Sequence, residues 1–426
     1  MTADGAAADG AAADGAAADD AAAPAVVSAA DRPWMRAARA AGLLDDDGTA
    51  RPTIFAEMSA LAAEHGAINL GQGFPDDGAP AAVLEAAVAA IEAGVNQYPP
   101  GRGIADLRHA IAEHQQRFYG LHLDPEREVL VTAGATEALA ASILALAGPG
   151  DDVVTLEPFY DAYAAVTGLA GARHVTIPLS EPGFQPTAAA IDAAITARTR
   201  VIVLNSPHNP TGSMLAPEHV DRIVALAARH DAVIVSDEVY EHLVYDGRRH
   251  VPVAIHPGAA ERTLTISSAA KTFAVTGWKI GWVTGPAALI DAVIGVKQWL
   301  TYVNGAPFQG AVATGLRMPD DTFAAVRATL QHRRDLLAAG LVEAGFSISP
   351  TAGSYFIVAE PPAAFGLGDA ASSARALAAD PGVVSIPLSA FGRPGGPVSP
   401  TALRFAFCKP EASIAEAARR LQQYRG

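Results

Sequence analysis

Cysteine is almost absent from this 426-residue sequence, which contains only Cys408. One cysteine cannot form an internal disulfide, so no disulfide framework holds the fold together, and a reducing, cytoplasmic compartment is expected. Early positive charge is also missing, because the first basic residue is Arg32. A secretory signal peptide starts with a basic region followed by an apolar core, so export is not expected.

Long apolar runs and an excess of basic residues are missing as well. The longest apolar stretch, residues 138–147 around one serine, is about half of the roughly 18 residues that a membrane-spanning helix needs. Lysine and arginine number 30 against 45 aspartates and glutamates, which gives a net charge of −15. Nucleic-acid binding requires a basic surface that displaces counterions. Neither a membrane nor a nucleic acid is therefore expected as a partner.

The first 30 residues differ in composition from the rest. Residues 3–22 repeat Ala-Asp-Gly-Ala-Ala with small changes, and they contain five aspartates and no basic residue. Such a segment has almost nothing to bury, and a glycine or aspartate every few residues works against a helix. We expect residues 1–30 to be a disordered acidic tail, with a functional arm as the alternative.

Short apolar strands alternate with helical patterns after the tail. The helices are expected over residues 80–93, 104–118 and 217–230, and the strands over residues 129–132, 153–156, 200–205, 232–237 and 263–268. This alternation predicts an α/β fold with a mostly parallel sheet covered on both faces, and ligands of such sheets bind at the carboxyl ends of the strands. Beyond about residue 316, a long helix (320–344) and a strand (403–407) indicate a smaller second domain.

Lys271 follows a predicted strand by three residues, with Ser268 three residues before it and Lys279 eight residues after it. A lysine amine in a desolvated, cationic pocket loses its proton readily and can form a Schiff base with a carbonyl. The serine hydroxyl and the second lysine would suit a phosphate. Single loop lysines usually lie on the surface, but Ser268 and the glycine-rich stretch TGWKIGW favour a site here.

Asp237 ends a predicted strand, and Tyr240 follows three residues later. A carboxylate at the bottom of a pocket can keep a pyridine nitrogen protonated, which makes the ring an electron sink, and a phenol can bind the 3′ oxygen of that ring. A metal site is the alternative, because Asp237/Glu241 and Glu238/His242 are each four residues apart. No HExxH motif and no cysteine pair supports this alternative.

Two other strand ends carry small polar groups. In NSPHNPTG, Asn205 and Asn209 flank a proline-containing turn, which would place Asn209 in the same crevice as a hydrogen-bond donor, although a turn without a ligand is equally consistent. In VTAGATEAL, Gly134 lets the backbone approach closely. A helix beginning at Thr136 would then offer polar groups of Ala135 and Thr136 to a phosphate.

Three more residues complete the candidate set. Tyr160, in EPFYDAY, is positioned to cover one face of a ring, although such tyrosines often only pack. Arg404 is a cation inside an apolar strand, so it either binds a carboxylate ligand or forms a structural salt bridge. Gly73, in NLGQGFPD, would let backbone approach a substrate. The G-x-G there lacks the remaining features of a dinucleotide loop, and the chain contains no G-x-S-x-G motif and no P-loop.

Taken in order, these motifs resemble those of class I/II, fold-type I aminotransferases that depend on pyridoxal phosphate. The resemblance covers roughly residues 50–425. It rests on NLGQGFPD, GVNQYPPG, VTAGATEAL, EPFYDAY, NSPHNPTG, SDEVYEHLVYDG, SSAAKTFAVTGWKIGW, GSYF and LRFAFCK. Within the family the chain is similar to the branch of kynurenine, glutamine, methionine and N-succinyldiaminopimelate aminotransferases, and most of all to the last.

The resemblance implies pyridoxal 5′-phosphate as cofactor and gives each candidate a role. Lys271 would bind the cofactor as a Schiff base and later move the proton of the substrate Cα. The other cofactor contacts would be Asp237 with the pyridine nitrogen, Asn209 and Tyr240 with O3′, Tyr160 with the ring face, and Ala135, Thr136, Ser268, Lys279 and the partner subunit's Tyr98 with the phosphate. The substrate α-carboxylate would contact Arg404, Asn209 and Gly73. Lys279 replaces an arginine of many relatives, so this contact would be a point charge.

The resemblance also implies a fold and an assembly. The large domain (77–315) would have three α/β/α layers and bind the cofactor, the small domain (316–426) would be α+β, and residues 31–76 would form an N-terminal arm and part of the small domain. Such enzymes are homodimers with shared active sites. A transcription regulator built on this domain would instead begin with a basic DNA-binding module, which the acidic N-terminus does not provide.

The expected reaction transfers an amino group from an amino acid to a 2-oxo acid, commonly 2-oxoglutarate. The first-choice donor is N-succinyl-diaminopimelate, in lysine and diaminopimelate biosynthesis. Glutamine, methionine, kynurenine and aromatic amino acids are the alternatives, with β-elimination of cysteine conjugates as a side reaction. The first-choice donor carries a distal carboxylate that needs a cation. Arg102 and Lys297 are candidates by position, and solvated surface roles are equally consistent with their sequence.

Overall fold

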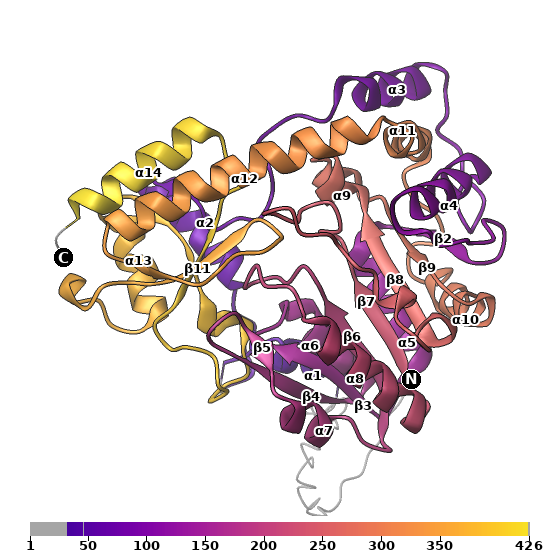
Figure 1. Cartoon of the computed structure of the whole chain (residues 1–426), viewed down its shortest axis with the longest axis horizontal. Helices are drawn as coiled ribbons and strands as arrows, with labels where there is room; N and C mark the ends of the chain where they lie inside the picture. Colours follow the sequence, from indigo (N-terminus) through magenta and orange to yellow (C-terminus); the bar gives the residue numbers. More distant parts are fainter. Residues whose placement is uncertain (1–31, 46, 425–426) are drawn as a thin grey trace, which may run out of the picture.

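The computed structural model describes residues 32–45 and 47–424 (Figure 1). The predicted acidic tail, residues 1–30, lies outside this range. Among the described residues, no helix combines the length and the apolar character that crossing a membrane requires.

An eight-stranded sheet forms the centre of the larger part of the molecule, in the order β2-β9-β8-β7-β6-β3-β4-β5. Its strands are β2 (Val129–Thr132), β3 (Asp152–Glu157), β4 (Arg173–Ser180), β5 (Gln185–Pro186), β6 (Thr199–Asn205), β7 (Val233–Asp237), β8 (Thr263–Ser268) and β9 (Gly281–Thr284). The central strands are parallel, whereas β9 runs antiparallel to both β2 and β8. The predicted mostly parallel sheet is confirmed, although β4, β5 and β9 were not predicted.

Helices cover both faces of this sheet and make three layers (Figure 1). On one face lie α5 (Gly134–Leu146), α6 (Asp161–Ala170) and α10 (Ala287–Lys297), and on the other lie α7 (Ala188–Ala194) and α8 (Pro217–His230). Successive strand residues point to opposite faces. Val201 and Val203 of β6 accordingly pack with α5 and α6, whereas Ile202 and Leu204 pack with α8. Burial on both faces explains why these strands read as continuous apolar runs.

Helix α8 illustrates how the sequence specifies its elements. It begins at Pro217, whose missing N–H is not needed in the first turn. Val220, Ile223 and Val224 recur at helical spacing and are buried. The helix ends where Asp231 adopts a left-handed conformation, with φ of +54°. The predicted bounds, residues 217–230, are confirmed.

A second, smaller sheet has the order β10-β11-β14-β13 and is antiparallel. Its strands are β10 (Ser347–Ile348), β11 (Phe356–Glu360), β13 (Ile386–Pro387) and β14 (Leu403–Ala406), and it packs with α12 (Asp320–Glu343), α13 (Ala370–Ala379) and α14 (Glu411–Gln423). The N-terminal strand β1 (Ile68–Asn69) pairs with β12 (Val383–Val384), and α2 (Ile54–His65) packs on α13. The division at residues 31–76, 77–315 and 316–426 stays a prediction.

The remaining helices lie near the β2 edge of the large sheet. They are α3 (Ala81–Glu92), α4 (Ala105–Tyr119), α9 (Ala269–Thr272) and α11 (Ala306–Leu316), while α1 (Pro33–Ala40) packs against α6. Leu107 and Ile111 of α4 are buried together with Val312 of α11 and Phe273, just after α9. This cluster holds α9, which carries Lys271, against the end of the sheet.

Candidate active site

A cavity of about 310 Å³ lies at the carboxyl ends of the central strands. The first residue of the antiparallel β9, Gly281, pairs with the last residues of β2 and β8, Thr132 and Ser268. Residues just before β9, such as Lys279, therefore lie at the same edge of the sheet as residues just after the parallel strands. All predicted site residues except Tyr98 line the cavity, namely Gly73, Ala135, Thr136, Tyr160, Asn209, Asp237, Tyr240, Ser268, Lys271, Lys279 and Arg404.

The amine of Lys271 points into the cavity from the short helix α9. Its Nζ donates to the carbonyl of Gly73 at 3.4 Å and lies 5.7 Å from the centre of the Tyr355 ring. Burial lowers the pKa of the Lys271 amine, partly offset by the nearby Cys408 and Asp237 side chains. A lowered pKa increases the neutral fraction of the amine, which is the form that acts as nucleophile or base.

The carboxylate of Asp237 lies buried at the end of β7. Its Oδ2 accepts a hydrogen bond from the Tyr163 hydroxyl at 2.7 Å, and its backbone carbonyl accepts one from Asn205 Nδ2 at 2.8 Å. Burial raises the pKa of the Asp237 carboxyl, and no basic side chain in the described part of the chain forms an ion pair with it. A buried carboxylate without a counterion suits a protonated ring nitrogen. The sequence did not identify Tyr163.

Polar groups near the start of α5 suit a phosphate. Helix α5 begins at Gly134, two residues before the predicted start at Thr136, so the N–H groups of Ala135 and Thr136 lie in its first turn. A Cβ on Gly134 would lie 3.3 Å from Lys279 Nζ, so glycine lets the ammonium approach the helix end. Ser268 also lines the cavity and pairs with Gly281, which lies against Gly134 and Ala135. A helix N-terminus with a cation and a hydroxyl is an anion site.

Two tyrosines, Tyr160 and Tyr240, also line the cavity. The Tyr160 hydroxyl hydrogen-bonds to Thr136, and burial raises the pKa of Tyr160 to about 12. Tyr240 packs edge-to-face on Tyr355, with 5.1 Å between ring centres, and burial raises the pKa of the Tyr240 hydroxyl. Both hydroxyls therefore stay protonated and able to donate a hydrogen bond.

Arg404 is buried in β14, and no carboxylate of the described residues forms an ion pair with it. Its Nη1 donates to Asn209 Oδ1 at 2.9 Å and its Nη2 to the carbonyl of Gly71 at 2.7 Å, while its Nε has no partner in the described part of the chain. The guanidinium carbon lies 4.0 Å from the ring centre of Phe356 and 4.6 Å from that of Phe391. Burial lowers the pKa of Arg404 to about 10. No structural salt bridge to Arg404 is therefore seen within the described residues, and an anion would complete this site.

The backbone of Gly73 connects Tyr355 and Lys271. Its carbonyl accepts hydrogen bonds from the Tyr355 hydroxyl at 2.5 Å and from Lys271. A Cβ at this position would lie 2.6 Å from Cζ of Phe356, so only glycine fits. Tyr355 belongs to the GSYF motif, which contributed to the resemblance without suggesting a role.

Three candidates lie outside the cavity lining. Tyr98 is 83% exposed and contacts only the Tyr302 ring, at 5.8 Å, among the ring pairs of the described residues. Arg102 forms an ion pair with Asp291, and the Lys297 amine donates to backbone carbonyls, including that of Tyr302. Within one chain, neither Arg102 nor Lys297 contributes a cation to the cavity.

The residues present fit pyridoxal phosphate, because one cavity is lined by a buried carboxylate without an ion-pair partner among the described residues, an anion cradle, and a lysine whose pKa burial lowers. Together with the α/β/α fold, this site defines a fold-type I, pyridoxal phosphate-dependent transaminase. The chain belongs to the family of class I and II aminotransferases, whose model matches residues 65–421.

Three comparisons illustrate the relationship. The chain is 52% identical over 378 residues to the probable N-succinyldiaminopimelate aminotransferase DapC of Mycobacterium tuberculosis, covering 87% of this chain and 95% of that protein. It is 38% identical over 371 residues to the methionine aminotransferase of Escherichia coli, with coverages of 87% and 95%. The solved N-succinyldiaminopimelate aminotransferase of M. tuberculosis superposes with a TM-score of 0.85 at 52% identity, covering 87% of this chain and 97% of that one.

Proposed function

We propose that this transaminase moves the amino group of N-succinyl-diaminopimelate to 2-oxoglutarate. One observation supports a substrate with a carboxylate. Arg404 is a buried cation without an ion-pair partner in the described chain, and it lines the same cavity as Lys271. The 52% identity to the M. tuberculosis protein that carries the name of this activity supports the proposed donor.

The chain's own residues divide the work of such a reaction. Bound pyridoxal phosphate supplies an electron sink that makes the substrate Cα–H bond acidic. Arg404 and Asn209 would orient the α-carboxylate, with Gly73 limiting its position. The Lys271 amine, whose pKa burial lowers, would then take the proton from Cα. The negative charge of Asp237, supported by the Tyr163 hydroxyl, would keep the ring nitrogen protonated.

The remaining cofactor roles follow the geometry of the cavity. The phosphate would be bound by Ala135, Thr136, Ser268 and Lys279. The ring would be covered by Tyr160, and O3′ would be bound by Asn209 and Tyr240. All seven residues line the cavity.

A second candidate donor class is uncharged, such as methionine, glutamine, kynurenine or an aromatic amino acid. The cations that line the cavity in the described chain are Lys271, Lys279 and Arg404, and each already has a proposed task. Phe55 and Leu139 add apolar surface to the same lining. This lining favours an apolar side chain unless a partner subunit supplies a cation. β-Elimination of cysteine conjugates is a side reaction of the same class.

We propose a homodimer in the cytoplasm. On α3, Leu84, Val88 and Ile91 expose apolar side chains, and Trp299 is 81% exposed. Such a surface is unusual for a monomer, and a second copy would cover it. It would also allow the exposed Tyr98 to reach the phosphate of the partner's site. The single, buried Cys408 supports a reducing compartment.

A panel of amino donors with 2-oxoglutarate tests the activity. We expect N-succinyl-diaminopimelate to give the highest kcat/KM, above glutamine, methionine, kynurenine and phenylalanine, and Lys271→Ala to remove all transamination. A best rate with methionine or phenylalanine would favour the second class, and pyruvate release without an acceptor would indicate β-elimination. Transamination by Lys271→Ala would contradict the proposed role of this lysine. Sedimentation of the wild-type protein tests the dimer.

A further inference from the structure

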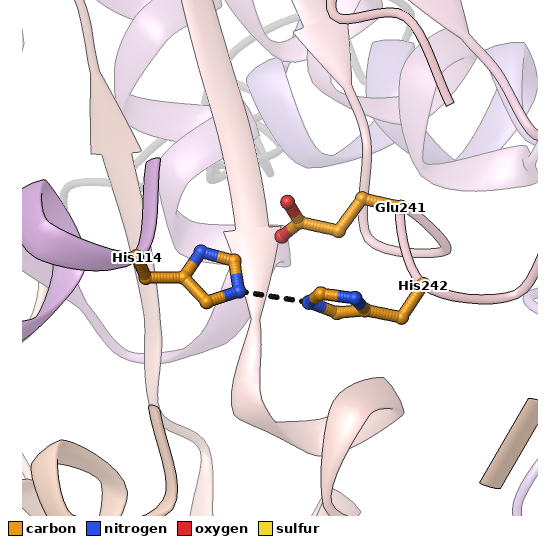
Figure 2. Close-up of side chains that lie close together, drawn as sticks. All are labelled: His114, Glu241 and His242. Atoms are coloured by element: carbon orange, nitrogen blue, oxygen red, sulfur yellow. Dashed lines mark hydrogen bonds between the residues drawn. The ribbon is translucent and has the colours of Figure 1, made fainter. Parts of the chain in front are cut away.

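A second group of chemistry-bearing side chains lies outside the active-site cavity. His114 extends from α4, and Glu241 and His242 extend from the turns that follow β7 (Figure 2). All three residues are buried, and one ligand atom from each lies within 4.8 Å of the others. The two imidazole rings point toward each other, with 2.8 Å between their Nε2 atoms. None of the three lines the cavity that contains Lys271.

The donor set matches a zinc-type ion. Two imidazole nitrogens and one carboxylate are a common ligand set for Zn²⁺, with metal–nitrogen distances of about 2.0–2.1 Å. Tetrahedral coordination at those distances separates the two nitrogens by roughly 3.3 Å. The present 2.8 Å separation of His114 and His242 therefore needs an opening of only about half an ångström.

The electrostatics of the cluster are incomplete without a cation. Glu241 is buried and accepts hydrogen bonds from Ser267 Oγ at 2.5 Å, from the Tyr119 hydroxyl and, at 3.4 Å, from Gln115 Nε2, but it forms no ion pair with a described basic residue. Gln115 Oε1 and His114 Nδ1 are also buried, without a hydrogen-bond partner among the described residues. Burying a carboxylate without a counterion is unfavourable, and a divalent ion would remove that cost.

The imidazoles are available as ligands. His114 Nε2 and His242 Nε2 face each other at 2.8 Å, and His114 Nδ1 makes no hydrogen bond among the described residues, so both Nε2 atoms can be directed at a shared ion. The Ser267 hydroxyl, which donates to Glu241, would hold the carboxylate in place behind the ion.

We propose that His114, Glu241 and His242 bind one divalent transition-metal ion, Zn²⁺ or the similar Co²⁺ or Ni²⁺. The ion would join α4 to the turns after β7 and stabilise the back of the active site without taking part in the chemistry. These three ligands differ from the pairs that sequence spacing suggested for a metal site, Asp237/Glu241 and Glu238/His242. Asp237 faces the cavity, and Glu238 bonds to His250 at 2.7 Å, so neither spaced pair forms a site.

Metal content provides the test. The full-length, cofactor-loaded protein would be produced in medium containing Co²⁺, and the metal bound per chain and the visible ligand-field absorption of Co²⁺ would be measured. We expect about one ion per chain, displaced by Zn²⁺. His114→Gln and Glu241→Gln should reduce the metal content at least tenfold, since each removes a ligand.

The matched control is His109→Gln, which changes an exposed histidine on the same helix and should keep the full metal content. Glu241→Gln preserves the side-chain shape, so it decides the matter if His114→Gln does not fold. Wild-type protein without bound metal overturns the proposal. Equal metal content in wild type, His109→Gln and Glu241→Gln overturns it as well, because exposed carboxylates would then be the binding groups.

Discussion

Asn209 accepts a hydrogen bond from Arg404 at 2.9 Å, although the two residues are 195 positions apart in the sequence. The backbone N–H of Asn209 in turn donates to Asn205 Oδ1 at 2.8 Å, and Asn205 Nδ2 donates to the carbonyl of Asp237 at 2.8 Å. One chain of hydrogen bonds thus joins the proposed carboxylate-binding group to the proposed ring-binding group. A change at either end is expected to disturb the alignment of substrate with cofactor.

Replacing Arg404 with glutamine should weaken the binding of both amino donor and 2-oxo acid, since each carries an α-carboxylate. Losing one partner of a buried, hydrogen-bonded charge pair costs about 2–5 kcal/mol, which corresponds to a roughly 30-fold or greater loss in kcat/KM. Steady-state kinetics with each substrate varied checks this expectation. Arg419→Gln is the control, because it removes only surface contacts with Glu416 and Gln423. Similar kinetics for the two variants would argue against the assignment.

Tyr163→Phe should change the pH dependence of cofactor binding. The Tyr163 hydroxyl bond lowers the pKa of Asp237 against the raising effect of burial, so its loss raises that pKa further. In the variant, Asp237 then becomes protonated at a higher pH than in the wild type. Since its charge holds the ring nitrogen, the affinity for pyridoxal phosphate should begin to decline at a higher pH in the variant. Absorbance titrations at several pH values measure this midpoint. Tyr245→Phe removes a buried hydroxyl that bonds to Ser354 instead, and its midpoint should match that of the wild type.

Gly73→Ala should impair both folding and substrate binding. The added Cβ would lie 2.6 Å from Phe356 Cζ, under the ring that supports Arg404, and overpacking of this kind costs about 1–3 kcal/mol. We expect a lower free energy of unfolding in urea and a higher KM for the donor. Gly78→Ala is the matched control in the same loop, because nothing lies within 4 Å of its Cβ. Equal stability of the two variants would contradict the proposed close packing.

Lys271→Met should stabilise the cofactor-free protein at neutral pH. Burial holds the pKa of Lys271 below that of a lysine in the unfolded chain, so the unfolded state binds more protons and the lysine lowers stability. This penalty shrinks as pH rises toward the unfolded pKa, and the advantage of the variant should shrink with it. Urea unfolding at neutral and alkaline pH measures the difference. Lys409→Met should gain no stability, because Lys409 has a carboxylate partner, Asp76, at 2.9 Å.

Residues that follow strong apolar strands were predictable from the sequence. Asp237, Ser268 and Asn209 come after such strands, and parallel strands bring their carboxyl ends to one edge. Strand β9, with the sequence GWVT, is too short and too rich in glycine and tryptophan to stand out from its surroundings. The sheet order that places β9 between β2 and β8 depends on contacts far apart in the chain.

Residues that support the site by hydrogen-bonding to another site residue could not be predicted from their position relative to a strand. Tyr163 lies in helix α6, and Tyr355 precedes strand β11, where tyrosines usually only pack. Their hydroxyls are recognised as parts of the site only from the partners they reach, Asp237 and Gly73. The pairing of His114 with a histidine 128 positions later is equally invisible in local spacing.

The loop that contains Gly71 and Gly73 also sets when the site can form during folding. Its carbonyls bond to Arg404, Tyr355 and Lys271 across 333, 282 and 198 residues of chain. Contacts at such separations form late, because the entropy of closing the intervening chain must be overcome first. A chain emerging from the ribosome cannot finish its carboxylate-binding group until the strand with Arg404 has been made. Binding of a substrate carboxylate can therefore report that this last stage of folding is complete.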